Sequence, residues 1–391
     1  MSRREPFDIA VVGAGVVGAA AALAFARDGR RVALVEAREP APWRADTPDL
    51  RVYAFAPDNA ALLDSLGVWR DVLAARAQPY RHMRVWDAAG GGELAFHAEA
   101  LGRDELGWIV EHGLLVDRLW QAIVREPGIV RHCPDHVVAL EQDEHAATLE
   151  LHGGARLKAR LVVAADGADS KLRELAGLAV DRHDYGQRGL VAYVRCQRPH
   201  RDTAWQRFLP TGPLAFLPCA DGRCSIVWTL PDDEAARLLA IDDAAFCREL
   251  SRAFDATLGE VVEVSRRVAF PLRRQLADDY VAGRVVLAGD AAHAVHPLAG
   301  QGVNLGLRDV ACLRRIVAGA GRHDIGTGHR LARYRRERRS DNTLSAWAFD
   351  GINRVFSNEA LLPTLLRGHL LGLAGRMPPL ARLLARRAAG I

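Results

Sequence analysis

The first forty residues contain two apolar runs separated by a glycine-rich turn. Residues 9–12 form a short continuous apolar run, residues 19–27 are rich in helix formers, and residues 31–35 form a second apolar run that ends at Glu36. Short runs of this kind are typical of buried strands, and the alanine-rich stretch between them favours a helix. The pattern predicts a strand, a turn, a helix and a second strand.

The same stretch admits a second interpretation. Residues 2–4 (Ser-Arg-Arg) precede an uncharged run over 9–26, which resembles a secretory or twin-arginine signal or a short membrane span. Against this, Gly13, Gly15 and Gly18 follow the G-x-G-x-x-G spacing. These glycines permit a tight turn, close approach of a phosphate to the backbone, and close packing of the helix on the strand. With Glu36 placed to accept ribose hydroxyls, the pattern favours dinucleotide binding and leaves FAD and NAD both open.

Two later apolar runs each end at an acidic residue. Residues 161–165 lead to Asp166, with Ser170 suited to cap a short helix, and residues 285–288 lead to Asp290. Ligands of open α/β sheets bind at the carboxyl ends of the strands, so both carboxylates are expected at one binding edge. A glycine-rich loop after Asp290 leads into a further helix.

Residues 190–230 have a different pattern, in which apolar and polar positions alternate as in an antiparallel sheet. With 391 residues, of which 49% are hydrophobic, the chain is long enough for two or three domains with cores of their own. The 26% charged fraction and the lack of compositional bias exclude fibrous and disulfide-scaffold classes. Six scattered cysteines without paired spacing indicate reduced thiols and no zinc site.

The charge is unevenly distributed along the chain. The net charge is +4, but the segment from Arg308 to the C-terminus holds 16 arginines against six acidic residues. A basic helical face is expected from residue 328 onward, made of Arg330, Arg333, Arg335, Arg336, Arg338 and Arg339. A leucine- and arginine-rich tail over 370–387 continues it. Such a surface favours contact with an anionic membrane or a partner protein, with ordinary packing on the body an equal alternative; nucleic acid is not expected.

The motifs together resemble a known family. G-x-G-x-x-G, the Asp-Gly of residues 166–167, and the pattern Gly-Asp-Ala-Ala-His-x-x-x-Pro-x-x-Gly-Gln-Gly-x-Asn of residues 289–304 are similar to those of FAD-dependent aromatic hydroxylases, the class A flavoprotein monooxygenases. The long third motif is similar to that of the ubiquinone-biosynthesis hydroxylases, which act on polyprenylated phenols. The resemblance extends over residues 8–339.

This resemblance implies an α/β fold. It consists of a Rossmann-like FAD-binding domain, an inserted and mainly antiparallel substrate sheet, and a helical C-terminus. The implied FAD-binding domain is discontinuous and comprises residues 1–75, 98–180 and 271–330. The substrate domain comprises 76–97 and 181–270, and the C-terminal helical region comprises 331–391. A cytoplasmic location is expected, either free or at the periphery of the inner membrane.

The resemblance also implies which residues bind the cofactor. Glu36 binds the adenosine ribose, Arg51 reaches the pyrophosphate, Asp166 serves the nucleotide region, and Asp290 accepts the ribityl hydroxyls. The implied set is Gly13, Gly15, Gly18, Glu36, Arg51, Asp166, Gly167, Asp290, Gly302, Val303 and Asn304. His112 and Asp169 stand where the family usually has other residues, so contacts on the adenine side transfer less directly.

The catalytic loop is expected to lie against the flavin ring. By the resemblance, Pro297 packs on the ring, and Gly300, Gln301, Gly302, Val303 and Asn304 present backbone N–H groups to its pyrimidine edge. This has an independent physical basis, because a helix N-terminus stabilises the negative charge of reduced flavin.

Phe216, Leu217 and Trp228 are expected to line the substrate pocket, although as core residues they need no such role. An apolar lining suits a prenylated ring better than a charged benzoate, which would require a placed arginine.

The residue that takes the phenol proton stays open among His183, Tyr185 and Tyr193. His293 and His296 have an H-x-x-H spacing. Because the sequence pattern indicates no third ligand, no metal is expected there.

The implied reaction uses NAD(P)H to reduce FAD and O2 to hydroxylate the ring. Because the sequence has one G-x-G-x-x-G, the nicotinamide is expected to visit transiently. Two alternatives stay open: a prenyl-chain reductase on the same fold, and a non-catalytic flavin-binding subunit of a biosynthetic complex. A halogenase is disfavoured, because it needs a buried lysine and the chain has only Lys158 and Lys171.

Overall fold

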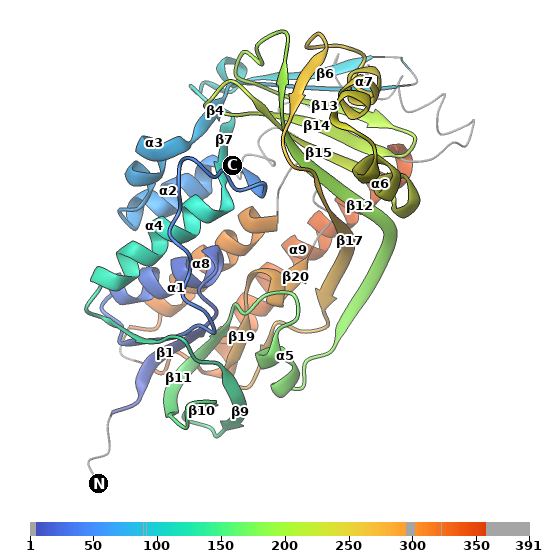
Figure 1. Ribbon diagram of the computed structural model, residues 1–391. Coiled ribbons are helices and arrows are strands. Elements are labelled where there is room, and N and C mark those ends of the chain that lie inside the picture. Colours follow the sequence, from blue (N-terminus) through green and yellow to red (C-terminus); the bar gives the residue numbers. More distant parts are fainter. Residues whose placement is uncertain (1–4, 89, 91, 295–301, 322, 357–391) are drawn as a thin grey trace.

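The chain folds around three β-sheets, as the computed structural model shows (Figure 1). The structure describes residues 5–88, 90, 92–294, 302–321 and 323–356. The first sheet contains β1 (Phe7–Val12), β2 (Val32–Val35), β8 (Ile129–His132), β9 (Val137–Gln142), β10 (Ala147–Leu151), β11 (Arg156–Ala164), β18 (Val281–Ala282) and β19 (Val285–Leu287). Its centre is parallel, in the order β19-β11-β1-β2-β8, and β9, β10 and β18 add antiparallel pairings.

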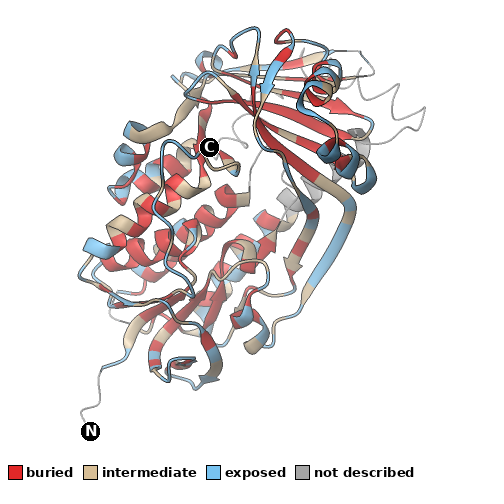
Figure 2. Cartoon of the chain, viewed as in Figure 1, coloured by how far each residue is buried: buried red, intermediate tan, exposed pale blue. Residues whose placement is uncertain are grey.

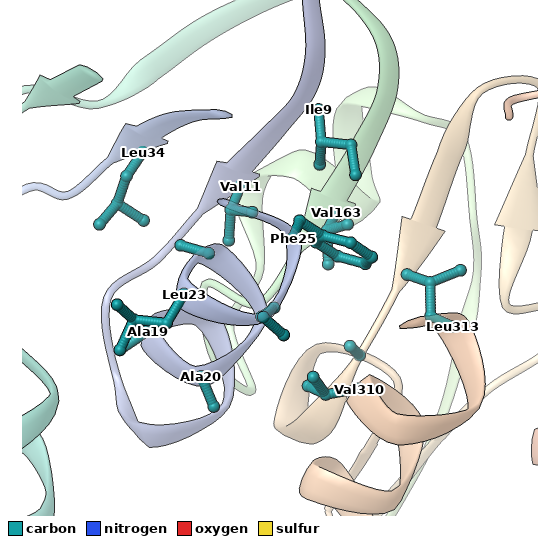
Figure 3. Close-up of a cluster of buried hydrophobic side chains, with 14 of the residues drawn as sticks. Ile9, Val11, Ala19, Ala20, Leu23, Phe25, Leu34, Val163, Val310 and Leu313 are labelled. Carbon is teal, nitrogen blue, oxygen red and sulfur yellow. The ribbon is translucent and has the colours of Figure 1, made fainter. Parts of the chain in front are cut away.

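The predicted strand–turn–helix unit is confirmed and forms the middle of this core. Helix α1 (Val16–Arg27) is buried along most of its length and packs on β1. In Figure 3, Phe25 lies beside Val163 of β11, and Leu313 of α8 (Gly302–Ala318) lies on the other side of it. The uncharged run that also resembled a signal or a membrane span is therefore part of the folded core.

Two glycines make this close packing feasible. Gly13 has φ +97°, and a Cβ on it would lie 2.3 Å from the Ala165 carbonyl oxygen. A Cβ on Gly18 would lie 2.0 Å from the Gly13 carbonyl oxygen. Real Cβ atoms do not approach oxygen so closely, so both positions require glycine.

The second sheet is large and mainly antiparallel, as the alternating pattern predicts. It contains β5 (His82–Asp87), β6 (Glu93–His97), β12 (Val180–Cys196), β13 (Thr203–Leu209), β14 (Gly212–Pro218), β15 (Cys224–Pro231), β16 (Val261–Val264), β17 (Val268–Ala277) and β20 (His293–Ala294). The pairing of β13 with β5 is parallel. Helices α6 (Asp232–Ala240) and α7 (Asp243–Ala253) cover one face, and the strands beneath them are largely buried (Figures 1 and 2).

A third, small sheet connects these two layers. It contains β3 (Val52–Phe55), β4 (Gln78–Tyr80) and β7 (Gly107–Glu111). The remaining helices are α2 (Pro57–Ser65), α3 (Trp69–Arg76), α4 (His112–Arg125), α5 (Lys171–Leu175), α8 (Gly302–Ala318) and α9 (Gly328–Phe356), with short 3₁₀ turns η1 (Ala98–Leu101) and η2 (Gly289–Ala291).

The expected domain limits stay a prediction, and sheet membership differs from them at β4, at β20 and over residues 271–277 of β17, which were expected in the cofactor domain but pair with β12 of the second sheet. Strand β4, expected in the substrate domain, pairs with β7 of the small sheet. Strand β20, expected in the cofactor domain, pairs with β17 of the second sheet. Long strands β12 and β17 therefore run continuously between the two layers (Figure 1).

The basic face expected from residue 328 lies on α9, and half of its arginines are ion-paired. Arg333 pairs with Glu337 on the same helix, Arg335 pairs with Asp279, and Arg338 pairs with Asp309. The tail over 370–387 lies outside the described residues. No helix in the part of the chain that the structure describes is long and apolar enough to cross a bilayer.

Candidate active site

A cavity of about 1120 Å³ lies where the first and second sheets face one another. One end is lined by the glycine turn, Glu36, Asp166 and Asp290, and the other by the inner face of the second sheet. The volume exceeds that of an ordinary small-molecule pocket. The cavity therefore has room for a dinucleotide and a second ligand in one continuous space.

The glycine turn fits a bound phosphate. Gly15 precedes the first turn of α1, whose unpaired N–H groups attract anions. A Cβ added at Gly15 would meet no described atom within 4 Å, and Gly15 lines the cavity. The missing side chain thus leaves open space above the N-terminus of α1, which is what a dinucleotide pyrophosphate requires.

Glu36 is held at the end of β2 by two backbone donors. The Ala14 N–H donates to one carboxylate oxygen at 2.5 Å and the Arg38 N–H to the other at 3.0 Å. These bonds fix the carboxylate beside the glycine turn, where it lines the cavity. Its role toward the adenosine ribose stays a prediction that this placement supports.

Asp166 has a structural partner as well as a cavity position. Its carboxylate accepts hydrogen bonds from the Ser170 hydroxyl at 2.5 Å and from the Leu172 N–H at 3.0 Å. Ser170 in turn caps α5 by accepting from the Arg173 N–H at 2.9 Å, as the sequence predicts. Gly167 and Asp169 also line the cavity. Asp166 therefore shapes the turn whose backbone borders the cavity.

Asp290 and the start of α8 also border the cavity. Asp290, Gly302 and Val303 line it, so the helix N-terminus opens toward the space beneath the second sheet. The expectation for Asn304 concerns its backbone N–H and stays a prediction, while its side chain has a structural role. Its buried amide accepts from the Ala56 N–H at 3.0 Å and donates to the Ala54 carbonyl at 2.8 Å, which ties α8 to β3.

The remaining loop residues of the expected catalytic set, Pro297, Gly300 and Gln301, lie outside the described residues.

Arg51, Tyr53 and His112 form a polar group on the cavity wall. The Arg51 guanidinium lies 5.4 Å from the Tyr53 ring centre, and the Tyr53 hydroxyl lies 2.9 Å from Nδ1 of His112. Burial, with the nearby Arg51 charge, lowers the pKa of His112 to about 4. His112 is therefore neutral at physiological pH, and Arg51 carries the positive charge available to a phosphate in this group.

The low pKa of His112 predicts an acid-dependent loss of stability. The unfolded histidine takes up a proton below about pH 6.5 and the folded one below about 4, so stability falls across this window by about 3 kcal/mol. We expect His112→Asn to remove this component, measured as a smaller fall in unfolding free energy between pH 7 and pH 4. His145→Asn, at an exposed position, is the control and leaves the pH dependence unchanged. An equal fall in wild type and His112→Asn would contradict the assignment.

Of the three residues expected to line the substrate pocket, only Leu217 does so. Phe216 stacks on Phe254 with ring centres 3.8 Å apart, and Trp228 packs near Phe246, both under the helices on the opposite face. The physical reason is the alternation of side chains along a strand, which prevents neighbours such as Phe216 and Leu217 from sharing a face.

The same alternation identifies the cavity residues that the sequence prediction missed. The lining positions of the second sheet are Val191, Gln206, Pro213, Ala215, Leu217, Val227, Thr229, Val268, Phe270 and Ala294, and Arg266 lines the cavity from the segment between β16 and β17. The wall is mostly apolar, with Gln206 and Thr229 as buried polar side chains.

None of the candidate bases is among the described residues that line the large cavity. His183 and Tyr185 pack edge to face on β12. The Tyr193 hydroxyl donates to the Asp49 carbonyl at 2.7 Å, and burial raises its pKa. Tyr193 instead lines a small neighbouring cavity.

A buried charged network lies behind Asp290 and was not anticipated. The Asp309 carboxylate accepts from the Gly289 N–H at 3.0 Å and from Nε of Arg338 at 2.7 Å, and it lies 2.6 Å from Nε2 of His293. Burial alone would raise the pKa of Asp309, but His293 and Arg338 outweigh it and lower the pKa to about 2. His293 is thus engaged by a carboxylate, and its H-x-x-H partner His296 lies outside the described residues.

Comparison with known proteins agrees with this geometry. Residues 6–343 match the FAD binding domain family. The chain is 38% identical to 3-demethoxyubiquinol 3-hydroxylase of Escherichia coli, over 94% of each chain. It is 39% identical to ubiquinone hydroxylase UbiL of Rhodospirillum rubrum, over 98% of this chain and 89% of that protein.

A solved structure shares the fold. The p-nitrophenol 4-monooxygenase of Pseudomonas putida superposes with a TM-score of 0.78 at 22% identity, over 98% of this chain and 97% of that one. Because residues 6–343 match the FAD binding domain family, the cofactor left open between FAD and NAD is FAD, which fits the open space above Gly15 and the size of the cavity. The chain belongs to the FAD binding domain family, and it is a flavoprotein monooxygenase related to the ubiquinone-biosynthesis hydroxylases.

Proposed function

We propose that this protein hydroxylates the aromatic ring of a polyprenylated phenol in ubiquinone biosynthesis, with FAD, NAD(P)H and O2. The observation that carries the proposal is the single cavity that joins the nucleotide-binding turn to the apolar inner face of the second sheet. The names of the two bacterial relatives support the same pathway.

The substrate end of the cavity suits a lipid-like ring. Its wall is apolar at Val191, Ala215 and Val227, and no cation is buried among the described lining residues of the second sheet. Val268 and Phe270 line the same cavity and are more than one third exposed, so the apolar wall continues to the surface. A ring with a long apolar substituent matches a pocket that is open and apolar at one end.

The chain contributes binding, orientation and exclusion of water. FAD, when bound, supplies the oxygen-activating redox chemistry. The N-termini of α1 and α8 border the cavity and would stabilise the negative charge of the cofactor's phosphates and of its reduced ring. Glu36, Arg51 and Asp290 are the side chains that would hold the ribose, pyrophosphate and ribityl groups. The buried wall of β14 and β15 keeps water from the reacting atoms.

The direct test is oxygen consumption by the FAD-loaded protein. With NAD(P)H present, we expect O2 uptake to rise on adding a prenylated phenol, with one oxygen atom recovered in the ring. Loss of a double bond from the prenyl chain, with no oxygen in the ring, would identify a prenyl-chain reductase and overturn the proposal.

Substitutions on the two faces of the second sheet are expected to have different effects, on substrate binding at the cavity face and on stability at the opposite face. We expect Val227→Phe, which adds bulk on the cavity side, to lower kcat/KM for the phenol about tenfold or more, a loss of about 1.4 kcal/mol or more, at unchanged FAD content. Phe216→Leu, on the opposite face, is expected to lower stability by about 1–3 kcal/mol and to leave KM unchanged. Steady-state kinetics and urea unfolding of both variants check this. Similar KM changes in both variants would contradict the assignment of the two faces.

We also propose that the protein works at a membrane surface or within a biosynthetic complex, where an apolar substrate is available. The basic residues of α9 that support this are Arg330, Arg336 and Arg339, which have no ion pair among those found in the described chain. Co-sedimentation with anionic vesicles, compared between wild type and a variant with these three arginines changed to glutamine, tests the membrane arm.

A further inference from the structure

A second cluster of metal-binding residue types lies at the edge of the first sheet. Asp135 and His136 come directly before β9, and His152 comes directly after β10. Val137 and Leu151 are paired across the two strands, and the His152 N–H donates to the His136 carbonyl at 2.9 Å. The two histidines are therefore cross-strand neighbours, held together by the backbone of the β9–β10 hairpin.

The side chains of this cluster converge. The imidazole rings of His136 and His152 lie 4.8 Å apart between centres, with 21° between their planes. One ligand atom from each of the two histidines and from Asp135 lies within 4.8 Å of the others. Cross-strand neighbours have Cβ atoms about 5 Å apart, a spacing that lets two imidazoles reach one ion.

The carboxylate of Asp135 is fixed in position before any ion binds. Its Oδ1 accepts hydrogen bonds from the His136 N–H at 2.8 Å and from the Gly153 N–H at 3.1 Å. No hydrogen bond within the described residues occupies its Oδ2. One oxygen thus anchors the carboxylate to both strands, and the other remains available as a ligand.

We propose that Asp135, His136 and His152 bind a divalent transition-metal ion of the zinc class. Two imidazoles and one carboxylate are a common protein ligand set for Zn²⁺, with water in the fourth position. Zinc ligands in a tetrahedral site lie about 3.4 Å from one another when each bond is about 2.1 Å. The half-exposed carboxylate and the exposed histidines need only side-chain rotations to close to that spacing.

The site lies beside the nucleotide end of the large cavity. Asp135 and His136 both line that cavity, and the Asp135 N–H donates to the Glu36 carbonyl at 2.9 Å. His152 does not belong to the described lining. An ion held here adds positive charge next to the segment that carries Glu36. The site shares no residue with the network of His293, Asp309 and Arg338.

The test is metal titration of the full-length, FAD-loaded protein with any histidine tag removed. Calorimetry with Zn²⁺ is expected to give one site per chain. Co²⁺ is expected to give a tetrahedral d–d absorption band at longer wavelength than the flavin, which Zn²⁺ then displaces. We expect His152→Ala to weaken Zn²⁺ binding at least tenfold and to abolish the Co²⁺ band. His152 is exposed and lies off the cavity lining, so its variant should keep the FAD content and melting temperature of the wild type.

His145→Ala is the matched control. His145 is exposed in the turn of the same hairpin and lies outside the cluster. It is expected to bind Zn²⁺ as the wild type does. Equal Zn²⁺ affinity in wild type and His152→Ala, or an equal loss in His145→Ala, would overturn the proposal. Neither result bears on hydroxylation, so this site and the proposed function can fail independently.

Discussion

Gly15→Val is expected to abolish FAD binding while leaving the fold intact. Gly15 has φ −64°, which any residue adopts, and a Cβ there would meet no described atom within 4 Å. The added side chain would instead occupy the space in front of α1, where we expect the pyrophosphate to bind. We expect the FAD dissociation constant to rise at least 100-fold, which corresponds to about 2.7 kcal/mol. The apoprotein should lose no more than about 1 kcal/mol of stability.

Gly13→Ala, two residues earlier, is the matched contrast. Its φ is +97°, and the added Cβ would lie 2.3 Å from the Ala165 carbonyl oxygen, so the fold itself should lose about 2 kcal/mol or more. Flavin absorbance after gel filtration and thermal melting of the apoproteins check both variants. Retention of FAD by Gly15→Val would contradict the placement of the phosphates. Product formation in cells by a flavin-free Gly15→Val protein would instead favour the non-catalytic subunit.

The comparison of Gly13 and Gly15 shows why the sequence could predict which residues line the nucleotide end of the cavity. The turn requires glycine at three fixed positions. Gly13 has a positive φ, Gly15 leaves room for a phosphate, and Gly18 permits close contact between strand and helix. Glu36, Asp166 and Asp290 come one to three residues after the ends of β2, β11 and β19, so their position at the cavity edge is a local consequence of the strand ends. Local patterns therefore predicted this half of the site.

For the end of the cavity under the second sheet, the sequence predicted only some of the lining residues. The composition of β14 and β15 indicates a buried sheet, but both faces are apolar, so composition does not show which face borders the cavity. Phe216 and Trp228 were expected to line the substrate pocket, whereas the smaller Ala215 and Val227 line the cavity. Bulky side chains fill the layer under α6 and α7, and smaller ones leave the space that a ligand needs.

The sequence did not predict the contacts between residues that are far apart along the chain. His136 and His152 meet through the register of a hairpin, and Asp309 meets Arg338 only when α9 docks on α8. Neither spacing corresponds to a local motif. Both clusters follow from tertiary packing, which a single sequence does not specify.

Arg338→Gln is expected to be the most destabilising of the α9 substitutions. Arg338 and Asp309 are both buried, and their Nε–Oδ1 distance is 2.7 Å. Removing the arginine leaves a buried carboxylate with fewer compensating charges, which costs about 3–5 kcal/mol. Arg333→Gln, five residues earlier on α9, removes an exposed ion pair with Glu337 and should change stability by about 0.5 kcal/mol or less. Urea unfolding of the two variants measures the difference.

Asp309→Asn tests the same network through its pH dependence. A carboxylate whose pKa falls from 3.8 when unfolded to about 2 when folded contributes about 2 kcal/mol, present above pH 4 and lost as the pH falls toward 2. The stability difference between wild type and Asp309→Asn should therefore shrink by that amount in acid. Because the Gly289 N–H donates to Asp309, the variant should also release FAD more readily through movement of the adjoining Asp290. A stability difference that is constant with pH would show that Asp309 is not held ionised by His293 and Arg338.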